Sequence, residues 1–354
     1  MAEGVMPRPR YCATVAIILS TFLTASSGQT APQTPDEAIS QFEKTTRSFK
    51  VQDSTTEIDV QNTVTQPNRG AVTKWSHFWH MLQTDGSRMR FEERQFHLSS
   101  QSAIRDIKNA HETLVLWTGE NWFEYYRIPP EPKHRYIVQK PDGRDRSEWV
   151  NNEFEACLQG VLSGDDKPLS EILRGASQIN GQYSRDDTSG VLLYRVNATT
   201  PQGKYTIWFD PTHQFNIARA EVVKAGNDLY YGKPLSAEKP PGNVVKSKLT
   251  EYGFTVRDVV FQRVDGIFFP TQARFSCRMT RSDGESFQQE GSYTCTHVDL
   301  APDFAKQAYF RPVFPDGTRV FVLPDDGVVW VWQDGKVVKR SGSTQPATLP
   351  TSQP

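Results

Sequence analysis

Residues 259–298 read V-V-F-Q-R-V-D-G-I-F-F-P-T-Q-A-R-F-S-C-R-M-T, then the polar segment R-S-D-G-E, then S-F-Q-Q-E-G-S-Y-T-C-T-H-V. Side chains alternate between the two faces of a strand, so the parity of each position sorts them. One face receives Ala273, Phe275, Cys277 and Met279, and on the return Gly291, Tyr293 and Cys295 share a face. The stretch therefore predicts one long strand, a turn and a returning strand, with an apolar face that other elements must cover.

The composition favours a β-rich protein. The chain has 354 residues and a formal net charge of -1. This length allows one large or two ordinary domains. A charge so close to zero gives no whole-chain signal for nucleic acid, which we do not expect as a partner. Aromatic residues make up 11% of the chain, and together with frequent β-branched residues they favour strands.

Residues 1–28 have the features of an export signal. Arg8 and Arg10 give a positive start, residues 12–25 are mostly apolar, and small residues suited to cleavage follow. The apolar run is short for a membrane span, and an uncleaved anchor or a buried helix is the alternative interpretation. We therefore expect an exported protein of the periplasm or cell envelope, with residues 29–34 as a linker.

The chain from Thr34 to residue 140 predicts a helix followed by an antiparallel meander. Thr34 is a suitable N-cap and Pro35 suits the first turn. From about Phe49 the apolar pattern changes to period two. Turn residues separate the strands, among them Asp85-Gly86 and the segment 119–121.

A helical block interrupts the strands and further strands follow it. From Glu148 to Leu162 apolar residues recur at helical spacing, and residues 168–173 predict a second short helix. Strands resume near Gln178. After Pro302 we expect a C-terminal β-hairpin extension over residues 302–340, and the Ser/Thr/Pro/Gln-rich residues 341–354 predict a disordered tail.

Two segments resemble periplasmic carriers of the outer-membrane lipoprotein-sorting family. K-Y-T-I-W-F-D-P-T-H-Q-F-N-I-A-R-A-E (204–221) resembles a family strand that ends in an aromatic residue and Asp-Pro, with a basic alternation in the next strand. V-D-G-I-F-F-P-T-Q-A-R-F (264–275) is similar to a later strand of that family. For residues 35–301 the resemblance implies an α+β fold: a strongly curved antiparallel β-sheet, an incomplete barrel, with helices covering the concave side. Its apolar hollow would hold acyl chains.

Large apolar side chains at alternating positions are the candidate lining of such a hollow. They are Trp75, Trp79, Tyr205, Ile207, Phe209, Phe275 and Tyr293. The alternative is that the same side chains form an ordinary packed core. Burial of an acyl chain is worth about 0.8 kcal/mol per methylene group, so a hollow of this kind needs no cofactor and no catalytic residue.

These observations predict an exported, non-catalytic protein that binds a lipoprotein acyl chain or another lipid. One alternative is an envelope module that binds a protein partner through strand edges and the terminal V-W-V-W hairpin. Another is a hydrolase of unrecognised type, which would need converging titratable groups in a cleft.

The remaining motifs favour structure over chemistry. His77 and His80 would point to opposite faces of a strand, so we expect no metal site there. Adjacent acids, Glu92-Glu93 and Asp186-Asp187, diverge for the same reason, whereas glycoside chemistry needs converging carboxylates. Cys277 and Cys295 fall on the apolar face of facing strands, which predicts a disulfide, with two buried thiols as the alternative.

Overall fold

The computed structural model describes residues 34–129, 135–140, 155–187, 189–237, 247–305, 309–322 and 328–340. The predicted export signal, the predicted tail and the first part of the predicted helical block, residues 148–154, lie outside these ranges. Within them, no helix combines the length and apolar character that crossing a bilayer requires.

The described strands form one large sheet with long strands at its centre. These are β1 (Val51–Gln66), β2 (Gly70–Asp85), β13 (Leu249–Val264), β14 (Ile267–Arg281) and β15 (Ser286–Asp299). One flank contains β10 (Asn216–Ala225), β9 (Gly203–Asp210), β8 (Leu192–Thr200) and β7 (Gln178–Arg185). The other contains β3 (Met89–Leu98), β4 (His111–Trp117), β5 (Trp122–Arg127), β6 (Arg135–Lys140), β16 (Arg319–Val322), β17 (Trp330–Gln333) and β18 (Lys336–Lys339).

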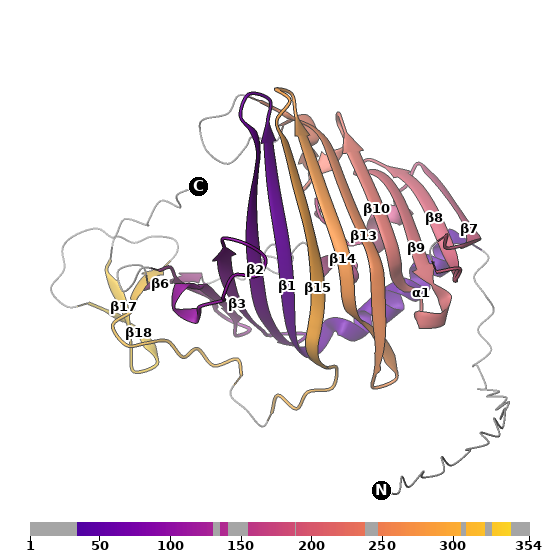
Figure 1. Ribbon diagram of the computed structural model, residues 1–354. Helices are drawn as coiled ribbons and strands as arrows, with labels where there is room; N and C mark the ends of the chain where they lie inside the picture. The colour runs from indigo at the N-terminus through magenta and orange to yellow at the C-terminus, as the bar shows by residue number, and fades with distance from the viewer. Residues whose placement is uncertain are drawn as a thin grey trace, which may run out of the picture. The chain divides into compact units, whose positions relative to one another are not determined.

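The strand order shows that this sheet does not close on itself. It runs β18-β17-β16-β6-β5-β4-β3-β2-β1-β15-β14-β13-β10-β9-β8-β7, so β18 and β7 are the two edges (Figure 1). Pairing is antiparallel except between β6 and β16, which are parallel. A separate pair, β11 (Leu229–Tyr230) and β12 (Lys233–Pro234), lies outside the large sheet.

The stretch that opens the sequence analysis forms three strands where two were predicted. Val264 pairs with Ile267, so Asp265 and Gly266 alone connect β13 to β14. Both residues have positive φ, 49° and 84°, as a type I′ hairpin turn requires. The prediction of one long strand was wrong because this Asp-Gly turn was taken as part of the strand. The predicted turn between β14 and β15 is confirmed.

Helix α1 (Pro35–Arg47) begins where its sequence predicts. The Thr34 hydroxyl accepts a hydrogen bond from the Glu37 backbone N–H at 3.3 Å, and Glu37 accepts one from the Thr34 N–H at 3.4 Å. This reciprocal capping box satisfies two backbone donors that the helix itself cannot pair. The cap fixes the start of α1, and the helix then buries Ala38, Ile39 and Phe42.

Helices pack against one face of the sheet. α1 joins the short helices α2 (Glu155–Leu158) and α3 (Leu169–Arg174) in a single core with side chains of β1, β8, β9, β10, β13, β14 and β15. In Figure 1, α1 (violet) crosses behind the strands of this flank. We call this the inner face, and the other the outer face. Of the first predicted helix, residues 148–162, only residues 155–158 are helical in the described part; Gly160, at φ 99°, precedes a loop containing Leu162. The predicted second helix, residues 168–173, is confirmed as α3.

The C-terminal extension continues the same sheet. β16 pairs in parallel with β6, and β17 and β18 form the predicted terminal hairpin beside it. Phe310, Phe314 and Trp332 are buried in a cluster with Phe123 and Ile137 from β5 and β6. Described residues between Phe304 and Val337 therefore contribute to the core around β4–β6.

The register overturns the predicted disulfide. Cys277 lies opposite Gln289 in the β14–β15 ladder, and Cys295 lies six residues farther along β15. At about 3.3 Å per residue this offset is about 20 Å, whereas the Cα atoms of a disulfide lie within about 7 Å of each other. No disulfide joins them. Shared parity put both on the same face, but it carries no information on register.

Candidate functional site

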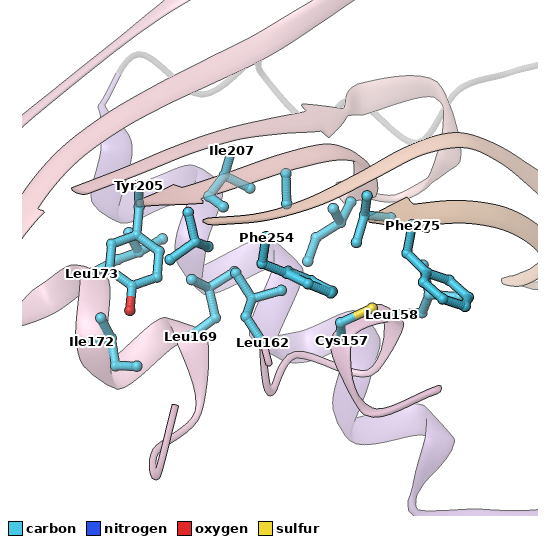
Figure 2. Packing of buried hydrophobic residues seen from close by; sticks show 14 of the residues in the cluster. Cys157, Leu158, Leu162, Leu169, Ile172, Leu173, Tyr205, Ile207, Phe254 and Phe275 are labelled. Carbon is cyan, nitrogen blue, oxygen red and sulfur yellow. The ribbon is translucent and has the colours of Figure 1, made fainter. Parts of the chain in front are cut away.

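Five of the seven predicted lining residues meet in the core between the sheet and the helices. Tyr205, Ile207, Phe209, Phe275 and Tyr293 all belong to the cluster that includes α1, α2 and α3. Figure 2 shows Leu162, Leu169 and Leu173 of the helical layer pointing toward strand side chains that include Ile207 and Phe254. The side chains of the helices and of the strands pack against each other and are buried. This is the arrangement expected if the five residues form an ordinary packed core.

Trp75 and Trp79 lie on the other face. Ile58 belongs to the inner core and pairs with Phe78, so Trp79 next to it points outward. Trp79 is half-buried beneath the guanidinium of Arg94, which lies 4.5 Å from the ring centroid. These two tryptophans therefore cannot line the same space as the other five.

A buried ion pair links the helical layer to the sheet. Lys224 of β10 donates from Nζ to Asp165 Oδ1 at 2.6 Å, and neither side chain is exposed to solvent. Tyr205 of β9 donates to the same oxygen, also at 2.6 Å. Lys224 donates further to the backbone oxygens of Gln202 and Leu229. We call Asp165, Lys224 and Tyr205 the latch, because Asp165 lies between α2 and α3.

Burial dominates the electrostatics of the latch. Loss of hydration raises the pKa of Asp165 to about 6, although the Lys224 ammonium and the Tyr205 hydroxyl both act in the opposite direction. Its second oxygen, Oδ2, is buried without a hydrogen-bond partner in the described part of the chain. Burial and the nearby Asp165 charge raise the pKa of Tyr205, which keeps its proton for donation. These three groups hold one geometry and leave no exposed reactive atom.

A groove of about 530 Å³ lies in the helical layer itself. Its apolar lining is Phe42 and Phe49 from the α1 side and Val161 and Pro168 from the facing segment. Charged residues occupy the rim, where Arg174 pairs with Glu43 at 2.9 Å and Glu43 also pairs with Arg47. The groove thus combines two aromatic side chains with a lining in which polar and charged residues are the majority.

Phe42 connects this groove to the predicted lining. Its ring lies 5.3 Å from that of Phe209 (centroid to centroid) in the core. On its groove side, a Cβ added to Gly160 would lie 3.2 Å from the Phe42 ring.

The other charged motifs are held in local ion pairs. His77 bonds Asp59 at 2.8 Å and His80 bonds Glu93 at 3.1 Å, on opposite faces of β2. Glu92 pairs with Arg90, so the two neighbouring acids diverge as predicted. No group of three potential metal ligands gathers within the described ranges.

The latch was not predicted from the sequence. Lys224 follows Ala220 and Val222 at inward-facing positions of β10, and a lysine there is the signal of a buried ion pair. Asp165 carried no comparable signal, because Ser163-Gly164-Asp165-Asp166 is equally typical of a helix end.

Comparison with known proteins gives only distant matches. Neither the protein-family models nor the curated proteins contain a match. Among solved structures, an outer membrane lipoprotein-sorting protein domain from Vibrio parahaemolyticus is 11% identical, with 73% of this chain and 89% of that chain covered and a TM-score of 0.31. A LolA superfamily protein from Nitrosomonas europaea is 11% identical, with 78% and 97% covered and a TM-score of 0.29. The ywiB protein from Bacillus subtilis is 4% identical, with 69% and 94% covered and a TM-score of 0.17.

Two of these three descriptions name the kind of protein that the sequence segments resemble. At these TM-scores the similarity is too low to assign a fold or a function to this chain.

Proposed function

We propose that this protein is a non-catalytic carrier or sensor that binds an acyl chain or another apolar ligand in the groove of its helical layer, next to the core that this layer forms with the sheet. The observation that carries the proposal is the groove floored by Phe42, which lies directly over Phe209 of the core. In this proposal the inner face is the concave side of an incomplete barrel and the helices cover it.

The dimensions and chemistry of the groove support an acyl ligand. Its volume of about 530 Å³ falls within the roughly 300–1,000 Å³ of small-molecule sites. Each methylene group buried there would contribute about 0.8 kcal/mol, so a chain of ordinary length needs no further bond. The rim charges Arg47 and Arg174 would lie beside the polar end of the ligand.

In its full form the proposal places the protein outside the cytoplasm, in the periplasm or cell envelope. The apparent export signal over residues 1–28 supports this location. The ligand would then be a lipoprotein acyl chain or another lipid, and outer-membrane lipoprotein sorting is the process that such binding would serve. Residues 35–301 would form the carrier domain.

A charge placed in the groove tests the proposal. Val161→Glu puts a carboxylate among the apolar lining residues, where it must lose hydration to coexist with an acyl chain. We expect the purified protein to bind a fluorescent long-chain fatty acid or a diacyl lipopeptide, and the variant to lose most of that affinity. Binding would be followed by fluorescence titration and by native mass spectrometry.

The matched control is Val223→Glu. Val223 is an exposed residue of β10 that points to the outer face. The substitution therefore introduces the same charge at a position away from the groove. Unchanged binding in Val161→Glu, or a wild-type protein that retains neither probe, would end the carrier proposal.

The terminal V-W-V-W hairpin gives less support to a partner-binding module. Trp332 is buried against Phe314 and Phe123, at centroid distances of 4.9 and 6.1 Å. Its largest side chain is thus used inside the protein. Deletion of this region would also disturb the core around β5, so loss of a partner in such a variant would not identify a binding surface.

A further inference from the structure

Three arginines lie side by side on the outer face of β10, β13 and β14. Arg257 of β13 is directly opposite Arg274 of β14. Ala220 of β10 is opposite Val256, which places Arg219 beside Arg257 on its other side. Like charges directly opposite each other on one face destabilise a strand pair. Stability of the free protein therefore does not explain why three arginines lie in this row.

Only the middle arginine lacks a carboxylate partner. Arg219 donates to Glu221 and stacks on Trp208, with its guanidinium carbon 4.5 Å from the ring centroid. Arg274 lies 3.9 Å from Asp258. Within the described ranges, Arg257 makes no ion pair, and it is exposed. Its planar guanidinium presents five N–H donors in a fixed geometry, and this geometry suits hydrogen bonding to an oxyanion.

A cavity of about 670 Å³ brings Arg257 and Arg219 to one wall. Its lining includes residues at two irregularities in the sheet. The ladder of β10 shifts register between Ile217 and Arg219, and that of β13 shifts between Arg257 and Val260. Asp258, within the second shift, has a positive φ of 55° without being glycine. Bulges of this kind redirect side chains and are frequent beside binding sites.

Three acids also line this cavity, and Asp258 is the one that lies 3.9 Å from Arg274. Asp210 accepts hydrogen bonds from the Thr212 backbone N–H at 2.8 Å and bonds His213 Nδ1 at 2.7 Å. Asp186 accepts from the Ser189 N–H and hydroxyl at 2.8 and 2.7 Å. Asp186 and Asp210 close their own turns and Asp258 faces Arg274. Arg257 is therefore the charged group of the lining that has no oppositely charged partner in the described part of the chain.

We propose that this cavity is a second ligand site, which binds a phosphate-type oxyanion through the guanidinium of Arg257. Two parallel N–H···O bonds from one guanidinium match the spacing of phosphate oxygens. Arg219 and Arg274, each already beside a carboxylate, flank Arg257 on either side, and a bound anion would relieve the repulsion within the row. The site lies on the face opposite the acyl groove, and the proposal of an oxyanion site does not depend on the proposal of an acyl ligand.

The response of thermal stability to inorganic phosphate tests the site. At constant ionic strength, millimolar phosphate in place of chloride should raise the Tm of the wild-type protein. Arg257→Gln should have a higher Tm than wild type without phosphate, because a like-charge contact is removed, and should lose the phosphate-dependent rise. Arg257→Lys keeps the charge without the planar fork and should keep only a small part of the rise.

Arg278→Gln is the matched control. Arg278 is an exposed arginine on the same face of the adjacent strand β14, opposite Gly253 and Gln288 and outside the cavity lining. It should respond to phosphate as wild type does. An equal phosphate response in Arg257→Gln and Arg278→Gln would overturn the proposal, and so would a wild-type protein that no phosphate probe stabilises.

Two further probes identify the source of the oxyanion. Glycerol 3-phosphate represents a soluble phosphate monoester, and vesicles of phosphatidylglycerol, compared with phosphatidylcholine, represent an anionic lipid headgroup. Either probe should bind to wild type and fail to bind to Arg257→Gln. The probe that binds more tightly identifies the source of the oxyanion. If both probes still bind to Arg257→Gln, the proposed site is contradicted.

Discussion

At the scale of single residues, Lys224 is the most informative side chain. It occupies an inward position of β10 and is fully buried, yet every partner that it needs is supplied by Asp165, Tyr205 and two backbone oxygens. A buried ion pair is weak support for stability as such, but it is costly to break. The latch therefore fixes where the segment between α2 and α3 lies more than how stable the protein is.

Breaking the latch on one side should be severely destabilising. Lys224→Met leaves the carboxyl of Asp165 buried without its cation, and we expect a loss of about 3–5 kcal/mol in the free energy of unfolding. The double variant Asp165→Leu with Lys224→Met should recover most of that loss, because no buried charge remains. Urea unfolding of the three proteins measures both effects. A single variant within about 1 kcal/mol of wild type would contradict the latch.

The pKa of Asp165 sets a pH dependence with a definite sign. Its folded value of about 6 exceeds its ordinary value of 3.8, so the folded protein binds this proton more tightly than the unfolded chain does. The resulting stabilisation is fully present below about pH 3.8 and is lost as the pH rises through about 6. Lys224, Tyr205 and Asp166 are the charged or titratable neighbours that act on it.

Subtraction isolates this contribution from the many other carboxyl groups. The unfolding free energy of wild type minus that of Asp165→Asn should fall across the interval from pH 4 to pH 6, by on the order of a few kcal/mol. Asp166→Asn changes the exposed neighbour and should retain the slope of wild type. A flat difference curve for Asp165→Asn would show that the carboxyl does not titrate in this range.

At the scale of elements, the contact between β14 and β15 depends on a missing side chain. Gly291 lies opposite Phe275, and its bare Cα leaves room for that ring over the inner face. A Cβ added at Gly291 would collide with the Phe275 ring and lie 2.7 Å from the backbone oxygen of Asp59. Packing of the predicted lining residue Phe275 thus requires glycine on the next strand.

Alanine at this position should destabilise the sheet. We expect Gly291→Ala to lower the free energy of unfolding by about 1–3 kcal/mol, because the ring must leave its place in a close-packed core. Gly253→Ala is the control: it lies in a neighbouring strand, and a Cβ there would meet no atom within 4 Å. Equal stability of the two variants, measured by chemical unfolding, would mean that Phe275 moves at no cost.

At the scale of the whole molecule, residues after Pro302 complete the sheet and its second core. β16 continues the sheet from β6, and Phe310 and Phe314 cover Phe123 on β5. A fully buried phenylalanine contributes about 1.5–3 kcal/mol. Removal of residues 302–354 should therefore lower the Tm strongly and expose apolar surface.

Dye binding and calorimetry would measure this effect. Removal of residues 341–354 alone, the tail that the sequence predicts to be disordered, provides the control and should leave both readouts unchanged. If the longer truncation unfolds at the wild-type temperature, the C-terminal strands are a dispensable addition to residues 35–301.

Alternation of side chains and the chemistry of turns made most of the strands predictable. Asp85-Gly86 and the segment 282–285 separate strands where the sequence places turns, and Thr34 caps α1 as expected. Asp265-Gly266 shows how the same reasoning fails. Apolar residues on both sides of a two-residue turn read as one continuous strand unless the positive φ of both residues is considered.

Local pattern alone determined which side chains of one strand point the same way: Tyr205, Ile207 and Phe209 face inward together, as do Ala273, Phe275 and Cys277. Only the tertiary structure decided which strands share a face and how far each slides along its neighbour. That is why Trp75 and Trp79 lie outside, why Cys277 and Cys295 do not meet, and why Lys224 finds Asp165. Parity repeats every two residues within a strand, whereas register and buried partners depend on contacts between residues far apart in the chain.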